Sequence, residues 1–290
     1  MPMSRAADAV PIPDQVEEAS FSPSTAPPAQ APKRWWGRPL AEVRWQAELA
    51  RLLVDPVFRG RDVPHGAGEP VLLIPGFLAS DGSLAVMHSW LRGVGYEPHF
   101  AGMLANVACS DRALDRLDAR LERIHGDSGR RVAVLGHSRG AHFAKALARR
   151  RPERVASVIS LGAGLDAPFE ISVPTKAAVA AVRAVHARTT DRVARNGCLT
   201  EACRCAFARD YAGEFPSEVP LTSIYSRGDG VVRWPACVVP YARCVEVTGS
   251  HVGLAFNRKA YREIALALAA SADRATPAEG AVAERPAAVA

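Results

Sequence analysis

Residues 131–140 read Arg-Val-Ala-Val-Leu-Gly-His-Ser-Arg-Gly. The apolar run at the start of this stretch breaks into Gly136-x-Ser138-x-Gly140, and residues 141–150 continue with the spacing of a helix. A serine on a sharp strand-to-helix turn needs flanking residues without a Cβ, because the strand and helix must approach closely to expose its hydroxyl. The stretch therefore predicts a nucleophile elbow, with Ser138 as the nucleophile and Gly136 and Gly140 as its structural glycines.

Strands and helices alternate on both sides of the elbow. Continuous apolar runs bounded by Gly or Pro are typical of strands buried on both faces, and segments with helical spacing separate them. This alternation predicts an α/β fold, with a mostly parallel sheet and helices on both faces. We expect strands at 71–74, 96–100, 132–135, 155–161, 221–225 and 244–247, and helices at 39–57, 84–94, 111–124 (capped by Ser110), 141–150 and 259–269.

Residues 164–216 interrupt the alternation. They contain two helical stretches, 175–187 and 200–212, and no strand pattern. An insertion after a strand lies above the carboxyl ends of the sheet, where ligands bind in open α/β folds. Two interpretations stay open: the insertion is a lid over a binding site, or it packs as an extra helical layer.

Length allows one or two domains, and the composition is that of an ordinary globular chain. The chain has 290 residues, 48% of them hydrophobic, which is enough for a full core. The ends at 1–33 and 272–290 are rich in Ala and Pro without apolar periodicity and are predicted to be disordered, which leaves a domain over 34–271. No stretch has the pattern of a signal peptide or a membrane span, so we expect a cytoplasmic protein.

The net charge of +6 does not by itself indicate a nucleic-acid partner. The arginines are spread along the chain and share helix faces with acids, as in 111–123, which is typical of a solvated surface. Residues 33–38, Lys-Arg-Trp-Trp-Gly-Arg, are a local exception. They predict either a weak contact with a membrane surface or two tryptophans that pack a leading helix onto the domain. The sequence does not indicate the oligomeric state.

The cysteines predict neither a metal site nor a cofactor. Three of the six form the cluster Cys198-x4-Cys203-x-Cys205, but zinc sites usually show two close pairs of ligands, and a second pair with histidines is missing. In a reducing compartment we expect free thiols; in an exported protein Cys198 could bridge to Cys203, and Cys237 to Cys244. The sixth cysteine is Cys109.

A serine nucleophile requires a base to take its proton and a carboxylate to orient that base. His251 lies in the loop 248–253, Thr-Gly-Ser-His-Val-Gly, between the last strand and the last helix, and it is the histidine best placed to be the base. Structural roles explain three other histidines better: His125, His137 and His142.

Two aspartates are candidates for the carboxylate. Asp229 lies in a Gly-Asp-Gly turn directly after the strand at 221–225, whereas Asp166 lies on an earlier loop. The chain order Ser138, Asp229, His251 matches the serine, acid, histidine order of one well-known arrangement of serine hydrolases. We therefore favour Asp229 and keep Asp166 as the rival.

Two backbone amides are expected to stabilise the negative charge on a substrate carbonyl oxygen. One is the amide of Arg139, directly after the nucleophile, and the other is the amide of Phe77 in the loop Pro75-Gly76-Phe77. Each such donor contributes roughly 3 kcal/mol to the stability of the transition state.

Together these parts resemble the α/β-hydrolase superfamily and, within it, bacterial lipases and esterases. The resemblance covers 71–269 and includes Pro75-Gly76-Phe77, where many lipases have His-Gly-x, the elbow 136–140, Asp229 followed by two valines, and the loop 250–253. Pro75 and Arg139 are departures, since a histidine and a glutamine or methionine are frequent there.

The resemblance implies an α/β-hydrolase fold with a helical lid insertion, and a serine carboxylic-ester hydrolase that forms an acyl-enzyme. Phe77 and the apolar stretch 177–185 suit an acyl chain, so a small-molecule or lipid ester is the expected substrate. The same fold also serves acyltransferases, thioester or amide hydrolases, and binding modules without turnover, and these alternatives stay open.

Overall fold

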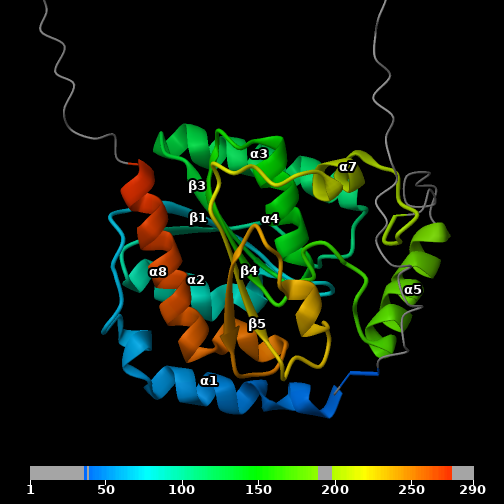
Figure 1. Ribbon diagram of the computed structural model, residues 1–290, viewed down its shortest axis with the longest axis horizontal. Coiled ribbons are helices and arrows are strands. Elements are labelled where there is room, and N and C mark those ends of the chain that lie inside the picture. The colour runs from blue at the N-terminus through cyan, green and yellow to red at the C-terminus, as the bar shows by residue number, and fades with distance from the viewer. Residues whose placement is uncertain (1–35, 38, 189–197, 276–290) are drawn as a thin grey trace, which may run out of the picture. The chain divides into compact units, whose positions relative to one another are not determined.

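The computed structural model of the chain describes residues 36–37, 39–188 and 198–275. Its centre is a six-stranded sheet in the order β2-β1-β3-β4-β5-β6, and every neighbouring pair is parallel (Figure 1). The prediction of a parallel sheet is confirmed. The strands are β1 (Pro70–Ile74), β2 (Glu97–Phe100), β3 (Val132–His137), β4 (Val155–Leu161), β5 (Leu221–Ser226) and β6 (Arg243–Val247).

The register brings the carboxyl ends of the central strands to one edge of the sheet. Ile74 at the end of β1 is level with Gly136, and His137 at the end of β3 is level with Leu161. The loops that follow these strands therefore meet at the same edge, which is where ligands bind in this class of fold.

Helices cover both faces of the sheet because its side chains alternate between two cores. Val71 and Leu73 pack in a core with α2 and α8, whereas Leu72 and Ile74 pack in a second core with α3 and α4 (Figure 1). All four side chains are fully buried, and burial of each such side chain contributes about 1.5–3 kcal/mol. The helices are α2 (Ala85–Gly93), α3 (Ser110–Ser128), α4 (Arg139–Arg150) and α8 (Arg258–Ala275).

The leading segment is broken rather than one helix over 39–57. It consists of the 3₁₀ helix η1 (Pro39–Arg44), the helix α1 (Trp45–Val54) and the 3₁₀ helix η2 (Pro56–Arg59). Helix α1 ends at Val54 because Asp55 is extended and Pro56 cannot continue an α-helical hydrogen-bond ladder. Asp55 instead caps η2 by accepting a hydrogen bond from the amide of Val57 at 3.0 Å.

The tryptophans of the basic motif do not both pack onto the domain. Trp36 is 62% exposed, and Trp35 lies outside the described residues. The aromatic contact that does hold the leading segment comes from Trp45, whose ring lies 5.7 Å from that of Phe256.

Two predicted helix starts are wrong. Helix α3 begins at Ser110 itself, and the Ser110 hydroxyl does not cap it but accepts a hydrogen bond from Arg139 at 3.2 Å. The helix expected over 200–212 is confined to α7 (Ala206–Ala212). Residues 200–205 are a turn, bends and irregular chain, in which Cys203 and Cys205 lie together; a helix would place residues two apart on different faces.

The two helices of the insertion differ in burial. In α5 (Val173–Ala187) no residue is buried. Helix α7 packs through Phe207, whose ring lies 5.2 Å from that of Phe143 on α4, and through the buried Tyr211. The layer interpretation therefore fits α7 but not α5, and the lid stays a prediction. The remaining 3₁₀ helices are η3 (Asp81–Leu84), η4 (Trp234–Cys237) and η5 (Val252–Phe256).

None of the helices in the described ranges is long and apolar enough to cross a membrane. Disorder was predicted over 1–33 and 272–290. Residues 272–275 instead form the end of α8, whereas 1–33 and 276–290 lie outside the described ranges.

Candidate active site

Ser138 lies at the sharp turn between β3 and α4, with a backbone conformation that few side-chain-bearing residues adopt. Its φ is 52° and its ψ is −124°. The turn is held by the Ser138 amide, which donates to the Leu161 carbonyl at 2.8 Å. Gly140 permits the close approach of helix and strand, since a Cβ there would lie 2.1 Å from the Ile74 carbonyl oxygen. Such a strained turn is the feature that exposes a nucleophilic side chain.

The loop after β1 lies against Ser138. A Cβ on Gly76 would lie 3.2 Å from the Cβ of Ser138. Among the described residues, neither the Phe77 amide nor the Arg139 amide donates a hydrogen bond. The Arg139 amide follows Ser138 in the chain, and the Phe77 amide belongs to the loop that lies against Ser138. Neither N–H group has a hydrogen-bond partner among the described residues, so both could bind an oxyanion.

A buried network holds this loop from behind. The side-chain amide of Asn106 donates to the Pro75 carbonyl at 2.8 Å, and its Oδ1 accepts from the Arg139 guanidinium at 2.7 Å. Arg139 also donates to the Ala108 carbonyl at 2.9 Å and lies over the ring of Phe143. Burial lowers the pKa of Arg139 to about 10, so its charge is retained near neutral pH. The side chain of Arg139 is therefore a brace for the loops around Ser138.

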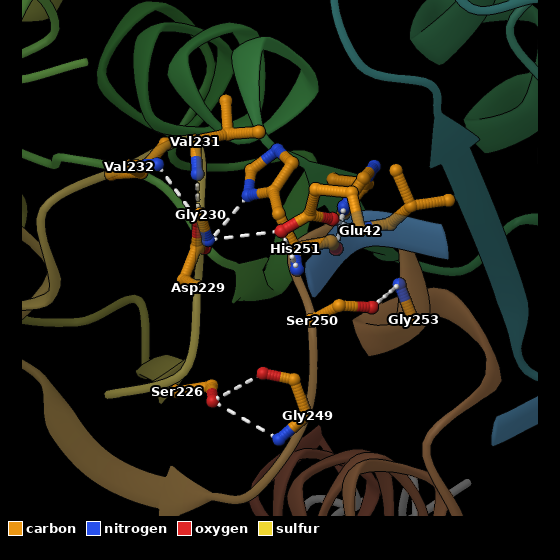
Figure 2. Close-up of polar contacts among 12 residues, drawn as sticks. Glu42, Ser226, Asp229, Gly230, Val231, Val232, Gly249, Ser250, His251 and Gly253 are labelled. Atoms are coloured by element: carbon orange, nitrogen blue, oxygen red, sulfur yellow. Dashed lines mark hydrogen bonds and ion pairs between the residues drawn. The ribbon is translucent and has the colours of Figure 1, made fainter. Parts of the chain in front are cut away.

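Asp229 and His251 form a buried pair. The Nδ1 of His251 donates to Oδ2 of Asp229 at 2.7 Å, and both residues are 5% exposed. The other carboxylate oxygen accepts from the amides of Val231 at 2.8 Å and Val232 at 2.7 Å (Figure 2). This arrangement fixes the imidazole tautomer with its proton on Nδ1 and leaves Nε2 as a proton acceptor.

The surroundings of His251 favour its protonated form. Burial lowers the pKa of His251, but attraction to Asp229, the hydrogen bond between them and the charge of Glu42 outweigh burial and raise it above its ordinary value. A histidine with a raised pKa is a stronger base, which suits removal of a proton from a hydroxyl.

Glu42, from the 3₁₀ helix η1, ties the acid loop to the histidine loop. Its Oε1 accepts from the amides of Gly230 at 2.9 Å and His251 at 3.0 Å, and its Oε2 accepts from the amide of Val252 at 2.9 Å (Figure 2). One carboxylate from the start of the domain thus positions both members of the pair.

Glu48 and Ser226 hold the same loops. The buried Glu48 of α1 accepts from the Ser250 amide at 2.9 Å and from the Ser250 hydroxyl at 2.7 Å. The Ser226 hydroxyl, at the end of β5, donates to the Gly249 carbonyl at 2.7 Å and accepts from the Gly249 amide at 3.1 Å (Figure 2). The histidine loop is therefore held on both sides.

The nucleophile turn and the Asp229–His251 pair meet at the end of β4. Gly162, with a φ of 60°, follows Leu161, and a Cβ there would lie 3.1 Å from Oδ2 of Asp229 and 3.2 Å from Nδ1 of His251. The Nε2 of His137 donates to the carbonyl of His251 at 3.0 Å. Within the described residues the Ser138 hydroxyl makes no hydrogen bond to His251 or to any other group, so it is available to a substrate.

The rival carboxylate lies elsewhere. The side chain of Asp166 is 54% exposed and pairs with Lys145 at 2.8 Å and with the hydroxyl of Tyr241. His142 is half-buried near Arg139 and Lys145, and loss of solvation lowers its pKa to about 3. His125 bonds the Arg130 carbonyl at 2.8 Å. Of the two aspartates, the structure brings only Asp229 to His251.

Sequence reasoning missed the residues that position the site: Glu42, Glu48 and Asn106. No local motif marks them, because their partners lie up to 210 positions away in the chain. The one signal available was that Glu42 and Glu48 interrupt the apolar pattern of a leading segment that packs on the domain.

The chain matches no model of a known protein family and no curated protein. Among solved structures it is similar to the propeptide form of the Bacillus licheniformis lipase BlEst2, with a TM-score of 0.50 and 16% identity over 71% of this chain and 51% of that chain. A monoacylglycerol lipase from Paleococcus ferrophilus has a TM-score of 0.47 and 16% identity over 71% and 97% of the two chains. A putative aryl esterase from Burkholderia cenocepacia has a TM-score of 0.45 and 16% identity over 71% and 93%.

The parallel sheet, the helices on both faces and the overlap with the BlEst2 lipase show that the chain has an α/β-hydrolase fold. The prediction of an α/β-hydrolase fold is confirmed, whereas the lid stays a prediction. Since one fold serves many reactions, the activity has to be argued from the site.

Proposed function

We propose that the protein is a serine carboxylic-ester hydrolase in which Ser138, His251 and Asp229 form the catalytic triad. The observation that carries the proposal is the buried hydrogen bond of 2.7 Å between His251 and Asp229, at the same sheet edge as the strained turn of Ser138. A histidine held in this tautomer, with a raised pKa, and a serine on a strained turn at the same edge of the sheet support nucleophilic catalysis.

The proposed reaction has two halves. Nε2 of His251 takes the hydroxyl proton of Ser138 as Oγ attacks the ester carbonyl carbon, and the amides of Phe77 and Arg139 bind the oxyanion that forms. His251 then gives the proton to the leaving alcohol, which leaves an acyl group on Ser138. Water, deprotonated by His251, attacks this acyl-enzyme, and the acid is released as Ser138 recovers its proton.

Apolar side chains next to the reacting groups support an acyl chain as part of the substrate. Leu78, beside the proposed oxyanion donor, is 55% exposed with a φ of 62°, and Val252, beside the proposed base, is 39% exposed. Exposed apolar side chains that flank polar groups in this way are typical of sites for amphiphilic ligands. A lipid or other apolar ester is therefore the proposed substrate class, and the insertion at 164–216 is the proposed lid.

The test is covalent labelling of the purified full chain by a fluorophosphonate probe. We expect labelling at Ser138, seen as a modified peptide by mass spectrometry, and its loss in Ser138→Ala. Ser160→Ala, at a buried serine of β4, is the matched control and should keep the label if it folds. A wild-type protein that stays unlabelled while folded by circular dichroism would overturn the proposal and favour a binding module without turnover.

A series of nitrophenyl esters of increasing acyl length then tests the substrate class. If the apolar side chains bind the acyl group, kcat/KM should rise with chain length. Fastest cleavage of the shortest ester would instead identify an esterase for small acyl groups.

A further inference from the structure

Four of the six cysteines converge outside the triad. Sγ of Cys109 lies 3.0 Å from Sγ of Cys198, and Sγ of Cys203 lies 2.9 Å from Sγ of Cys205. The ligand atoms of Cys198, Cys203 and Cys205 all lie within 4.8 Å of one another. Cys198 links the two sets, since its Sγ is 3.0 Å from that of Cys109 and within 4.8 Å of those of Cys203 and Cys205.

We propose that Cys109, Cys198, Cys203 and Cys205 bind one zinc ion in a structural four-thiolate site. Zinc prefers tetrahedral sulfur ligands, and structural sites are closed by four protein ligands. With Zn–S distances of about 2.3 Å, the sulfurs of such a site lie about 3.8 Å apart. Cys198, Cys203 and Cys205 already lie within 4.8 Å of one another, and Cys109, which is 3.0 Å from Cys198 but outside that group of three, has to move towards Cys203 and Cys205 to become the fourth ligand. On binding, the thiols release their protons to solvent as four Zn–S bonds form.

The spacing along the chain favours a metal over two disulfides. The sulfur pairs, at 3.0 and 2.9 Å, lie between the roughly 2.05 Å of a disulfide bond and the spacing of about 3.8 Å in a zinc site, so the positions of the cysteines in the chain have to decide between the two. A pairing of Cys203 with Cys205 would close a ring with one intervening residue, whereas two such cysteines are easily ligands of one ion. The bridge considered from sequence, Cys198 with Cys203, leaves Cys109 beside Cys198 unexplained.

The surroundings suit a buried, negatively charged centre. Cys109 and Cys198 are each 3% exposed, and Cys203 and Cys205 are half-buried. Zinc with four thiolates carries a net charge of −2, and the buried guanidinium of Arg139 interacts with both Cys109 and Cys198. Asp111, the nearby carboxylate, is held by the Phe207 amide at 2.7 Å and so is not needed as a ligand.

The site would join the insertion to the catalytic loops. Cys109 follows the segment in which Asn106 holds the Pro75 carbonyl and Ala108 accepts from Arg139. Cys205 directly precedes α7, the packed helix of the insertion. A zinc ion here would cross-link residues 106–109, which hold the loop 75–77, to residues 198–205. The binding of zinc can therefore be tested whether or not Ser138 is a nucleophile.

Metal analysis of the full chain, purified under reducing conditions without a metal-affinity step, tests the proposal. We expect about one zinc per chain by inductively coupled plasma mass spectrometry. Cys203→Ser, at a half-buried position, should lose the zinc. Cys244→Ser, at a half-buried cysteine outside the group, is the matched control and should keep it.

Cobalt substitution gives a readout that a structural change alone would not produce. Cobalt(II) in the wild-type site should show the intense visible bands of tetrahedral coordination and thiolate-to-cobalt charge transfer in the near ultraviolet, and Cys203→Ser should lower both intensities. Folded protein without zinc, whose four thiols are alkylated freely or whose intact mass shows two disulfides, would overturn the proposal. Iron or copper in place of zinc would overturn it as well.

Discussion

The turn that carries Ser138 and the loops that carry Asp229 and His251 are positioned in different ways. The nucleophile turn is held by the adjoining strand and helix and by the close packing of Gly140 against Ile74. The acid and histidine loops are held by Glu42 and Glu48, which lie about 200 positions earlier in the chain. Part of this site is therefore determined by local sequence, and part by carboxylates that only the folded chain brings near.

The largest expected effect separates the two aspartates. Asp229→Asn should lower kcat roughly 10⁴-fold, because an amide in place of the carboxylate selects the wrong imidazole tautomer. Ester hydrolysis at saturating substrate measures this. Asp166→Asn, at an exposed carboxylate paired with Lys145, should leave kcat within a few-fold of the wild type; the reverse pattern would assign the acid to Asp166.

A glycine substitution tests the nucleophile turn, the part of the site that is determined by local sequence. Gly140→Ala places a Cβ 2.1 Å from the Ile74 carbonyl oxygen, so helix α4 and strand β1 must separate. A misplacement of about 1 Å costs on the order of 10²-fold in rate, and we expect a loss of at least this size in kcat.

The matched control for that variant is Gly126→Ala on α3, where nothing lies within 4 Å of the added Cβ. It should raise the free energy of unfolding by about 0.5–1 kcal/mol and leave kcat unchanged. Equal activity of the two variants would show that the close packing at Gly140 does not position Ser138.

A variant that removes a charge tests the part of the site that is held by distant carboxylates. Glu42→Gln removes a negative charge that raises the pKa of His251 and weakens the hydrogen bonds to three amides. Since the neutral imidazole is the base, kcat/KM should increase with pH through the pKa of His251, which lies above 6.5 in the wild type. In Glu42→Gln the midpoint should move to lower pH, and the plateau should fall about tenfold.

The pH profile of kcat/KM from 5 to 9 measures both effects of Glu42→Gln. Glu153→Gln, at an exposed carboxylate paired with Arg154, is the control and should keep the wild-type profile. A lower plateau with an unchanged midpoint would mean that Glu42 holds the loops but does not raise the pKa of His251.

The smallest effect on kcat is expected at Asn106, which holds the loop 75–77. Asn106→Asp keeps the oxygen that accepts from Arg139 but loses the donor to the Pro75 carbonyl. The free energy of unfolding should fall by about 1–3 kcal/mol, and kcat by several-fold with KM little changed. Urea unfolding and ester kinetics measure these, and an unchanged kcat would limit the role of Asn106 to stability.

The fold and the elbow were predictable from sequence because they depend on short-range regularities. A continuous apolar run such as 155–161 predicts a buried parallel strand, and β4 has these bounds. Gly136-x-Ser138-x-Gly140 predicts the turn because its geometry is determined within a few residues. Position and chain order favoured Asp229 over Asp166 but did not exclude Asp166, since both aspartates follow strands that end at the same edge.

The sequence by itself determined the sheet, the nucleophile turn and the chain order of serine, aspartate and histidine, since periodicity and turn chemistry are local properties. Only the tertiary structure decided that Asp229 rather than Asp166 bonds His251, that Glu42 and Glu48 hold their loops, and that Cys109 completes a group of four thiols. These contacts join residues 22 to 210 positions apart, and their formation depends on how the whole chain packs.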